Sequence, residues 1–276
     1  MTDHAERCAA FRALHARATP FIIPNPWDAG SARIMAHAGF EALATTSAGL
    51  AFSLGRQDGA VTRDEALANA RAIIAATPLP VSADLENGYG HAPEIVAETF
   101  RLAFASGLAG ASVEDATGDP AAPIYPRDHA IARVAAAVAA ARAFPHPFTV
   151  TARAEGFLHG QPDLDEVITR LRAFEAAGAD VVYAPGLPDL AAIRRVTSAV
   201  ACPVNVLASA ANPVTLAELA TAGARRISLG AALSRTALGA LFRALDDLRA
   251  GRFDFLATAA PTAQVNACMV EPNSWP

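Results

Sequence analysis

The chain has 276 residues with a hydrophobic content of 53% and a charged content of 18%, which excludes an intrinsically disordered protein. Its formal net charge of −5 gives no reason to expect nucleic acid or an anionic membrane as a partner. No apolar run reaches the roughly 18 residues that a membrane-spanning helix needs. All 22 basic residues are arginines, which excludes chemistry that depends on a Schiff-base lysine or a P-loop lysine.

Short apolar runs of the kind that form buried parallel strands recur along the chain. They cover residues 21–25, 42–46, 81–86, 111–115, 148–155, 181–184, 204–208 and 226–230. Alanine-rich segments with helical periodicity lie between them, at residues 64–76, 93–106, 127–143, 164–177, 190–199, 213–222 and 232–250. This alternation of strands and helices predicts an α/β protein with a parallel sheet.

Eight strand–helix units in about 250 residues predict a closed (β/α)8 barrel of the TIM type. A doubly wound open sheet is the alternative, but no G-x-G-x-x-G motif follows the first strand. Because no linker or change in composition interrupts the chain, we expect a single barrel domain over residues 1–276. Residues 258–276 lack a helical period and are rich in Pro, Asn and Thr, so we expect a C-terminal arm there and not a ninth unit.

The cysteines and the N-terminal residues indicate the cellular compartment of the protein. Cys8, Cys202 and Cys268 are widely spaced and odd in number, which predicts neither a disulfide framework nor a zinc pair. The first residues lead into an arginine-containing helical pattern and not into an apolar segment, so no signal peptide is expected. The sequence therefore predicts a cytoplasmic protein.

Acidic side chains gather where the predicted strands end, which is where barrels of this type carry their chemistry. Asp84 and Glu86 end the third strand, and Glu114 ends the fourth. Asp58 lies in the loop after the second strand, and Arg153 stands at the end of the fifth. We therefore expect several carboxylates and one guanidinium at one rim of the barrel.

Carboxylates this close repel one another unless a cation lies among them. Oxygen ligands without histidine or thiolate suit Mg²⁺, with Mn²⁺ as a possible substitute. Asp84 and Glu86 are two positions apart, so on a strand both would project to the same face. The alternative is that these acids cap helices or pair with arginines.

One of these strand ends resembles a known family. The sequence Asp-Leu-Glu-Asn-Gly-Tyr-Gly at 84–90 is similar to the D-x-[DE]-x-G-Y-G strand end of the isocitrate lyase and phosphoenolpyruvate mutase superfamily. Further matches follow the order of that family: Ser-Ala-Gly-Leu at 47–50 with Asp58 after it, Ser-Val-Glu-Asp at 112–115, Ala-Arg-Ala-Glu at 152–155 and Pro-Val-Asn-Val at 203–206. Each motif alone is weak, but together they span residues from about 20 to 250.

The resemblance implies an α/β barrel whose last helix is exchanged with a neighbouring subunit, in a homodimer or a homotetramer. It also implies Mg²⁺ as the cofactor and a small 2-oxo acid, or its enolate, as the ligand. Carried over by position, Asp84 would bind the metal directly, while Glu86, Glu114 and Asp58 would contact it or hold its water molecules.

The same resemblance assigns the groups that meet the substrate. Arg153 would bind the substrate carboxylate or stabilise the enolate oxygen, and we count it with Glu114 and Asp58 as catalytic. The substrate-binding set that we predict is Ser47, Ala48, Gly49, Leu50, Asp84, Arg153 and Asn205. Within that set, residues 47–50 would offer backbone N–H groups and a hydroxyl.

The chain departs from the family in the loop after the fourth strand. The lyases of the superfamily carry a K-[KR]-C-G-H sequence there, whose cysteine is the acid–base group, and mutase-like members carry an asparagine. Residues 116–129 contain neither a cysteine nor an asparagine. Tyr125, His129 and Asp119 are the candidate acids, with plain loop residues as the alternative interpretation.

We therefore expect a Mg²⁺-dependent enzyme that acts on a small 2-oxo acid through an enolate, by carbon–carbon lysis or decarboxylation. The first alternative is carbon–phosphorus chemistry, as a phosphonopyruvate hydrolase or a phosphoenolpyruvate mutase. The second alternative is a protein that binds a 2-oxo acid and turns nothing over.

Overall fold

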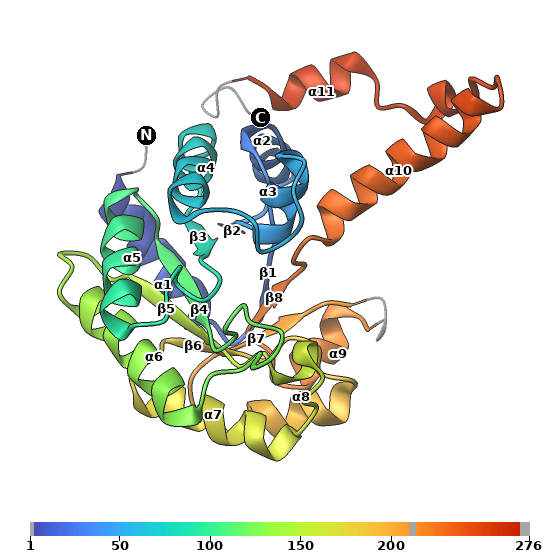
Figure 1. The fold of residues 1–276 in the computed structure, drawn as a ribbon. Helices are drawn as coiled ribbons and strands as arrows, with labels where there is room; N and C mark the ends of the chain where they lie inside the picture. The colour runs from blue at the N-terminus through green and yellow to red at the C-terminus, as the bar shows by residue number, and fades with distance from the viewer. Residues whose placement is uncertain (1–2, 210–213, 271–276) are drawn as a thin grey trace.

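Eight parallel strands form one sheet in the order β1-β8-β7-β6-β5-β4-β3-β2 in the computed structural model, which describes residues 3–209 and 214–270. The strands are β1 (Phe21–Ile23), β2 (Leu43–Ala44), β3 (Val81–Asp84), β4 (Gly110–Glu114), β5 (Thr149–Arg153), β6 (Val181–Tyr183), β7 (Val204–Leu207) and β8 (Arg226–Ser228). Each overlaps an apolar run of the sequence. The sheet curls into a nearly closed barrel with helices around it, which confirms the (β/α)8 prediction (Figure 1).

The helices alternate with the strands, and most of them pack on the outside of the barrel (Figure 1). They are α1 (His4–His15), α2 (Ala29–His37), α3 (Ser47–Ser53), α4 (Arg63–Ala76), α5 (Pro93–Ala105), α6 (Arg127–Arg142), α7 (Leu164–Ala176), α8 (Leu190–Thr197), α9 (Leu216–Thr221), α10 (Ala232–Arg249) and α11 (Thr262–Cys268), with short 3₁₀ helices η1 (Gly156–His159) and η2 (Asp254–Thr258). Asp3, Thr62 and Thr215 begin their helices with capping boxes, each closed by a glutamate three residues later. None of the helices in the described ranges is long and apolar enough to cross a membrane.

The barrel closes between β1 and β2 through a backbone hydrogen bond and the side chain of Asn25. Ala44 N donates to Pro24 O at 3.1 Å. The buried amide of Asn25 donates to Ala44 O at 3.0 Å and to Thr45 O at 3.2 Å, and its oxygen accepts from Leu229 N at 2.9 Å. Asn25 therefore joins the strand ends on both sides of the seam and fixes the rim that the site uses.

The main core lies between the strands and the outer helices, where large side chains such as Ile73, Phe100, Leu171 and Phe174 are completely buried. Bulky apolar side chains on the outer face of the sheet pack against apolar helix faces, and this burial is the largest favourable term in folding.

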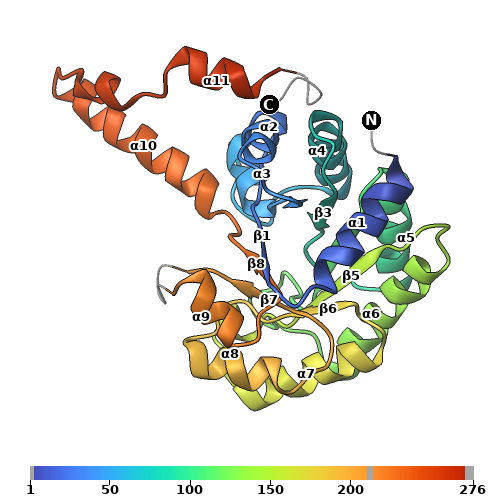
Figure 2. The same ribbon diagram turned by 180° about the vertical axis from the view of Figure 1, so that it is seen from behind.

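The C-terminal segment leaves the barrel. Helix α10 projects away from it, and α11 runs back to α2 (Figures 1 and 2). Arg33 of α2 fixes the end of α11 by donating to Met269 O at 2.6 Å and to Val270 O at 2.9 Å. Residues 262–268 form α11 although the sequence showed no helical period there.

The one-domain organisation stays a prediction. Pro213, the expected start of a helix, and residues 271–276 of the expected arm lie outside the described residues.

Candidate active site at the carboxyl ends of the strands

A cavity of about 530 Å³ opens at the carboxyl ends of the strands and continues into the barrel lumen. Small side chains on β2, β3 and β4, including Ala44, Ser82, Ala83 and Ser112, line its wall and leave this space open. The volume falls in the range of small-molecule sites, which is about 300–1,000 Å³. The cavity is therefore large enough for a small acid and its hydration.

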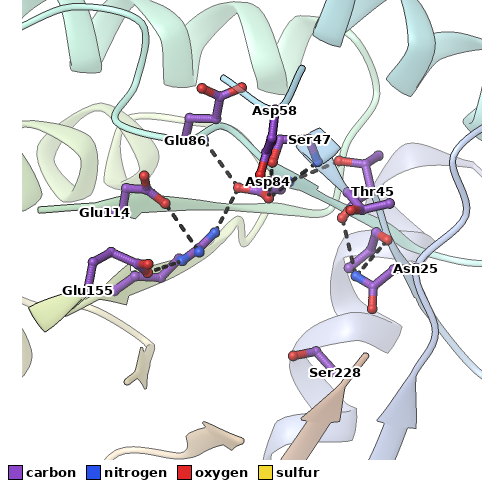
Figure 3. A network of polar contacts seen from close by, with 12 residues as sticks. Asn25, Thr45, Ser47, Asp58, Asp84, Glu86, Glu114, Glu155 and Ser228 are labelled. Atoms are coloured by element: carbon purple, nitrogen blue, oxygen red, sulfur yellow. Dashed lines mark hydrogen bonds and ion pairs between the residues drawn. The ribbon is translucent and has the colours of Figure 1, made fainter. Parts of the chain in front are cut away.

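Asp84 lies at the centre of the polar contacts of this cavity (Figure 3). Its Oδ1 accepts from Arg153 Nη1 at 2.8 Å and from the backbone N–H of Glu86 at 3.2 Å. Its Oδ2 accepts from the hydroxyl of Ser47 at 3.1 Å and from the backbone N–H of Ser47 at 3.4 Å. Ser47 is the first residue of α3, so the positive end of that helix also faces the Asp84 carboxylate.

Arg153 ends β5 and makes ion pairs with three carboxylates. Besides Asp84, it contacts Glu114 through Nη2 at 3.2 Å and Glu155 through Nε at 2.8 Å. Burial alone would lower the pKa of Arg153, but these carboxylates hold it well above its ordinary value. The cation is therefore permanent and fixed in one orientation.

Glu86 reaches the site by a route that the sequence did not indicate. Strand β3 ends at Asp84, and Glu86 lies in the following turn with a φ of 48°. The expectation that both carboxylates project from one strand was therefore wrong, because the chain leaves the extended conformation before Glu86. Its Oε1 is buried without a hydrogen-bond partner, and burial together with Asp84 and Asp58 raises the pKa of Glu86 to about 7.

Asp58 and Glu114 complete the acidic group at the rim (Figure 3). Asp58 lies in the loop between α3 and α4, where burial of its carboxylate and the nearby Asp84 raise its pKa. Burial also raises the pKa of Glu114 well above its ordinary value, and Arg153 opposes this only in part. The acidic group as a whole is short of positive charge.

These residues fit a hydrated divalent cation. Within the described residues, no three acidic, histidine or cysteine side chains lie close enough to share one ion as direct ligands. Mg²⁺ usually keeps several water molecules and takes one or two carboxylates. The partnerless oxygen of Glu86 and the shortage of positive charge both suit such an ion, with Asp84 as the direct ligand and Glu86, Glu114 and Asp58 around its water.

Not every residue of the predicted substrate set faces the cavity. Ser47 and Ala48 line it. The N–H groups of Gly49 and Leu50 are already used inside α3, where they donate to the hydroxyl and carbonyl of Thr46 at 3.3 Å and 3.1 Å. Asn205 lines the cavity, deep in the lumen, where it contacts other side chains and not the carboxylates at the rim.

The candidate acids of the 116–129 loop face away from the cavity. The hydroxyl of Tyr125 lies 2.6 Å from His91 Nδ1, and His129 Nε2 lies 2.9 Å from the carbonyl oxygen of His91. Asp119 accepts from Ala121 N at 2.9 Å within its own loop. None of the three lines the cavity.

Sequence reasoning missed two polar residues of β8 that line the same cavity, Arg226 and Ser228. Their signal was present, because an arginine opens a strand whose other residues are small or apolar. Tyr183, Asn205 and Arg226 continue the register row of Arg153 across adjacent strands, so their side chains share its face of the sheet.

The chain is similar to proteins of one family over most of its length. A model described as phosphoenolpyruvate phosphomutase matches residues 11–249. A solved structure from Burkholderia cenocepacia, described only as a lyase/mutase, is 54% identical with a TM-score of 0.95 and covers 98% of this chain and 97% of its own. An oxaloacetate decarboxylase from Ectopseudomonas mendocina is 32% identical over 90% of this chain and 86% of the relative. A 2-methylisocitrate lyase from Escherichia coli is 31% identical over 77% and 74%.

Proposed function

The chain belongs to the phosphoenolpyruvate phosphomutase family, and we propose that it is a Mg²⁺-dependent enzyme that cleaves a carbon–carbon bond of a small 2-oxo acid through an enolate. The observation that carries this proposal is the acidic rim around Asp84 and Arg153, which combines excess negative charge with one fixed guanidinium. The relatives named as a decarboxylase and a lyase support the choice of carbon–carbon cleavage.

The residues of the rim would have separate roles in binding and catalysis. Arg153 offers planar paired donors that match a carboxylate or an enolate oxygen. Ser47 offers a hydroxyl and a backbone N–H on the same side as Asp84. When Mg²⁺ is bound at Asp84, it would supply the Lewis acidity that stabilises charge on a keto oxygen. The half-buried position of these groups strengthens their electrostatic effect on the ligand.

Exchange of the methyl protons of pyruvate in D₂O tests whether the site forms an enolate. We expect the wild-type protein with Mg²⁺ to accelerate exchange by about 10²-fold or more over Mg²⁺ alone, as positioned acid–base groups commonly do. The proton NMR signal of the methyl group measures the rate, and removal of the metal with EDTA should abolish it. Bound pyruvate without exchange would contradict an enolate mechanism.

Two observations keep the alternative functions open to test. The family model carries the name of a phosphomutase, which supports carbon–phosphorus chemistry, and release of phosphate from phosphonopyruvate would identify it. The candidate acids of the 116–129 loop face away from the cavity, which supports a protein that binds and does not turn over. Tight binding of 2-oxo acids without proton exchange would identify that case.

We expect no efficient cleavage of isocitrate or 2-methylisocitrate. The loop that carries the acid in the lyases has no cysteine here, and no side chain of residues 119, 125 or 129 reaches the cavity. General acid catalysis is worth about 10²–10⁴-fold, so turnover should fall at least that far below a working lyase. A coupled assay for the released 2-oxo acid measures it, and efficient turnover of either compound would contradict the prediction.

We also expect a homodimer or homotetramer that exchanges α10 between subunits. Leu241, Phe242, Leu245 and Leu248 of α10 are exposed, with Phe242 64% exposed, and an apolar helix face of this kind needs a partner. Phe242→Glu should therefore shift the mass from oligomer to monomer in light scattering, while Arg249→Glu on the same helix should not. A monomeric wild-type protein would contradict the exchange.

The cytoplasmic location stays a prediction.

A further inference from the structure

Arg226 lies deeper in the lumen than the acidic rim. It is the first residue of β8, whereas Glu114 and Arg153 are the last residues of their strands. Arg226 also lies in the register row of Arg153, which runs from the last residue of β5 to the first residue of β8, and because barrel strands tilt, this row descends into the lumen. Arg226 is only 6% exposed, yet it lines the same cavity as Arg153. The cavity therefore has a second guanidinium, deeper than that of Arg153.

The contacts of Arg226 are few and neutral. Its Nε donates to the side-chain oxygen of Asn205 at 2.9 Å, and its Nη1 lies 3.4 Å from His15 Nε2. The other ring nitrogen of His15 lies 2.8 Å from the carbonyl oxygen of Phe11, which assigns the proton to Nδ1 and leaves Nε2 as an acceptor. Burial beside Arg226 lowers the pKa of His15 to about 3, so this imidazole carries no charge near neutral pH.

The other buried arginines are compensated far better. Arg153 contacts three carboxylates, and Arg170 contacts the carboxylates of Asp115 and Glu166. Arg133 donates to three peptide carbonyl oxygens. Within the described part of the chain, Arg226 contacts no carboxylate. A buried cation without a counter-charge is costly, and proteins seldom keep one without a use.

We propose that Arg226, with Asn205 and Ser228 beside it, binds an anionic group inside the lumen. Asn205 Nδ2 donates to Ser228 Oγ at 2.9 Å, so the amide and hydroxyl are held next to the guanidinium. Ser228 lies away from the carboxylates of the rim in Figure 3, as a second subsite requires. The open volume of the lumen gives the anion a path from the rim.

This site would select the substrate class, an inference that rests on the proposed function. A 2-oxo acid head held at Arg153 would leave its tail pointing into the lumen. The Arg226 position is three strands from Arg153 along the register row, or roughly 14 Å around the curved barrel wall at about 4.8 Å per strand, so the two side chains approach each other more closely across the lumen. The substrate is therefore a 2-oxo acid with a second carboxylate at the far end of its chain.

A matched pair of ligands tests the second carboxylate. 2-Oxoglutarate and 2-oxopentanoate have the same chain length and the same head and differ in the distal carboxylate. With Mg²⁺ present, calorimetry on the wild-type protein should show at least about 10-fold tighter binding of the diacid, the lower value for a hydrogen bond to a charged group. Arg226→Met should weaken the binding of 2-oxoglutarate by about 10- to 150-fold and leave the affinity for 2-oxopentanoate nearly unchanged. The neighbouring Arg225, which does not line this cavity, provides the control variant Arg225→Met.

Several results would overturn the proposal. If the wild-type protein binds the two acids with equal affinity, the proposal is overturned without any variant. If Arg226→Met loses affinity for both acids equally, Arg226 has a structural role and the proposal is also overturned. If the wild-type protein binds neither acid, the proposed function fails, and a crystal soaked in bromide then tests the subsite alone. Anomalous density for bromide at Arg226 supports the anion site, and its absence overturns it. Bromide at Arg226 together with equal binding of the two acids overturns the assignment to substrate.

Discussion

Replacement of Asp84 by alanine is expected to abolish Mg²⁺ binding and activity while the barrel stays folded. The Asp84 carboxylate accepts hydrogen bonds from Arg153, Ser47 and the backbone N–H of Glu86. It therefore orients these groups of the rim and also offers an oxygen to a metal. Mutation of groups that only support metal ligands typically costs about 10–100-fold in metal affinity, so loss of a direct ligand should cost at least about 100-fold. Calorimetric titration with Mg²⁺ measures it.

The fold should survive because the cluster holds more negative than positive charge. Removing one carboxylate relieves the repulsion that raises the pKa of Glu86 and of Asp58. The melting temperature of Asp84→Ala should therefore stay near that of the wild type, and the pKa of Glu86 should fall from about 7. Asp119→Ala, which removes a carboxylate outside the cavity, is the control. Unchanged Mg²⁺ affinity in Asp84→Ala would show that the metal site lies elsewhere.

The arrangement of the barrel could be read from the sequence because its strands are buried on both faces. Such strands appear as continuous apolar runs, and a polar residue in them is conspicuous. Glu114 and Arg153 stood at the ends of two such runs, and the structure places both at the ends of β4 and β5. Their meeting follows from the parallel register, in which Glu114 pairs with Arg153. Nothing beyond strand order was needed to bring them together.

Other parts of the site depend on local conformation, which residue types do not determine. The left-handed backbone of Glu86 is unusual for a residue with a side chain, and a strand pattern gives no sign of it. Residues 47–50 were expected to offer backbone N–H groups to the substrate, but Thr46 is the N-cap of α3 and its hydroxyl accepts from the N–H of Gly49. The expectation that site residues lie at the carboxyl ends of strands does not reach Arg226, because it is the first residue of β8.

The second large effect is expected from Arg153→Lys. Lysine keeps the positive charge but loses the planar fork that contacts Asp84 and Glu114 through separate nitrogens. If Arg153 also binds the ligand, the change should remove at least one charge-assisted hydrogen bond, worth about 1.5–3 kcal/mol. We therefore expect a loss of about 10- to 150-fold in 2-oxo acid affinity or kcat/KM, with little change in Mg²⁺ binding to the free protein.

The competing explanation is that Arg153 only neutralises its neighbours. It contacts three carboxylates, and its side chain is 13% exposed, as a purely structural cation would be. In that case Arg153→Lys should lower the melting temperature first, since one ammonium cannot contact all three carboxylates in the same geometry. Ligand affinity should then fall only as far as the fold is lost. Measuring the melting temperature and the 2-oxo acid affinity on the same protein sample separates these roles. If Arg153→Lys is less stable but binds 2-oxo acids with normal affinity, Arg153 does not recognise the ligand.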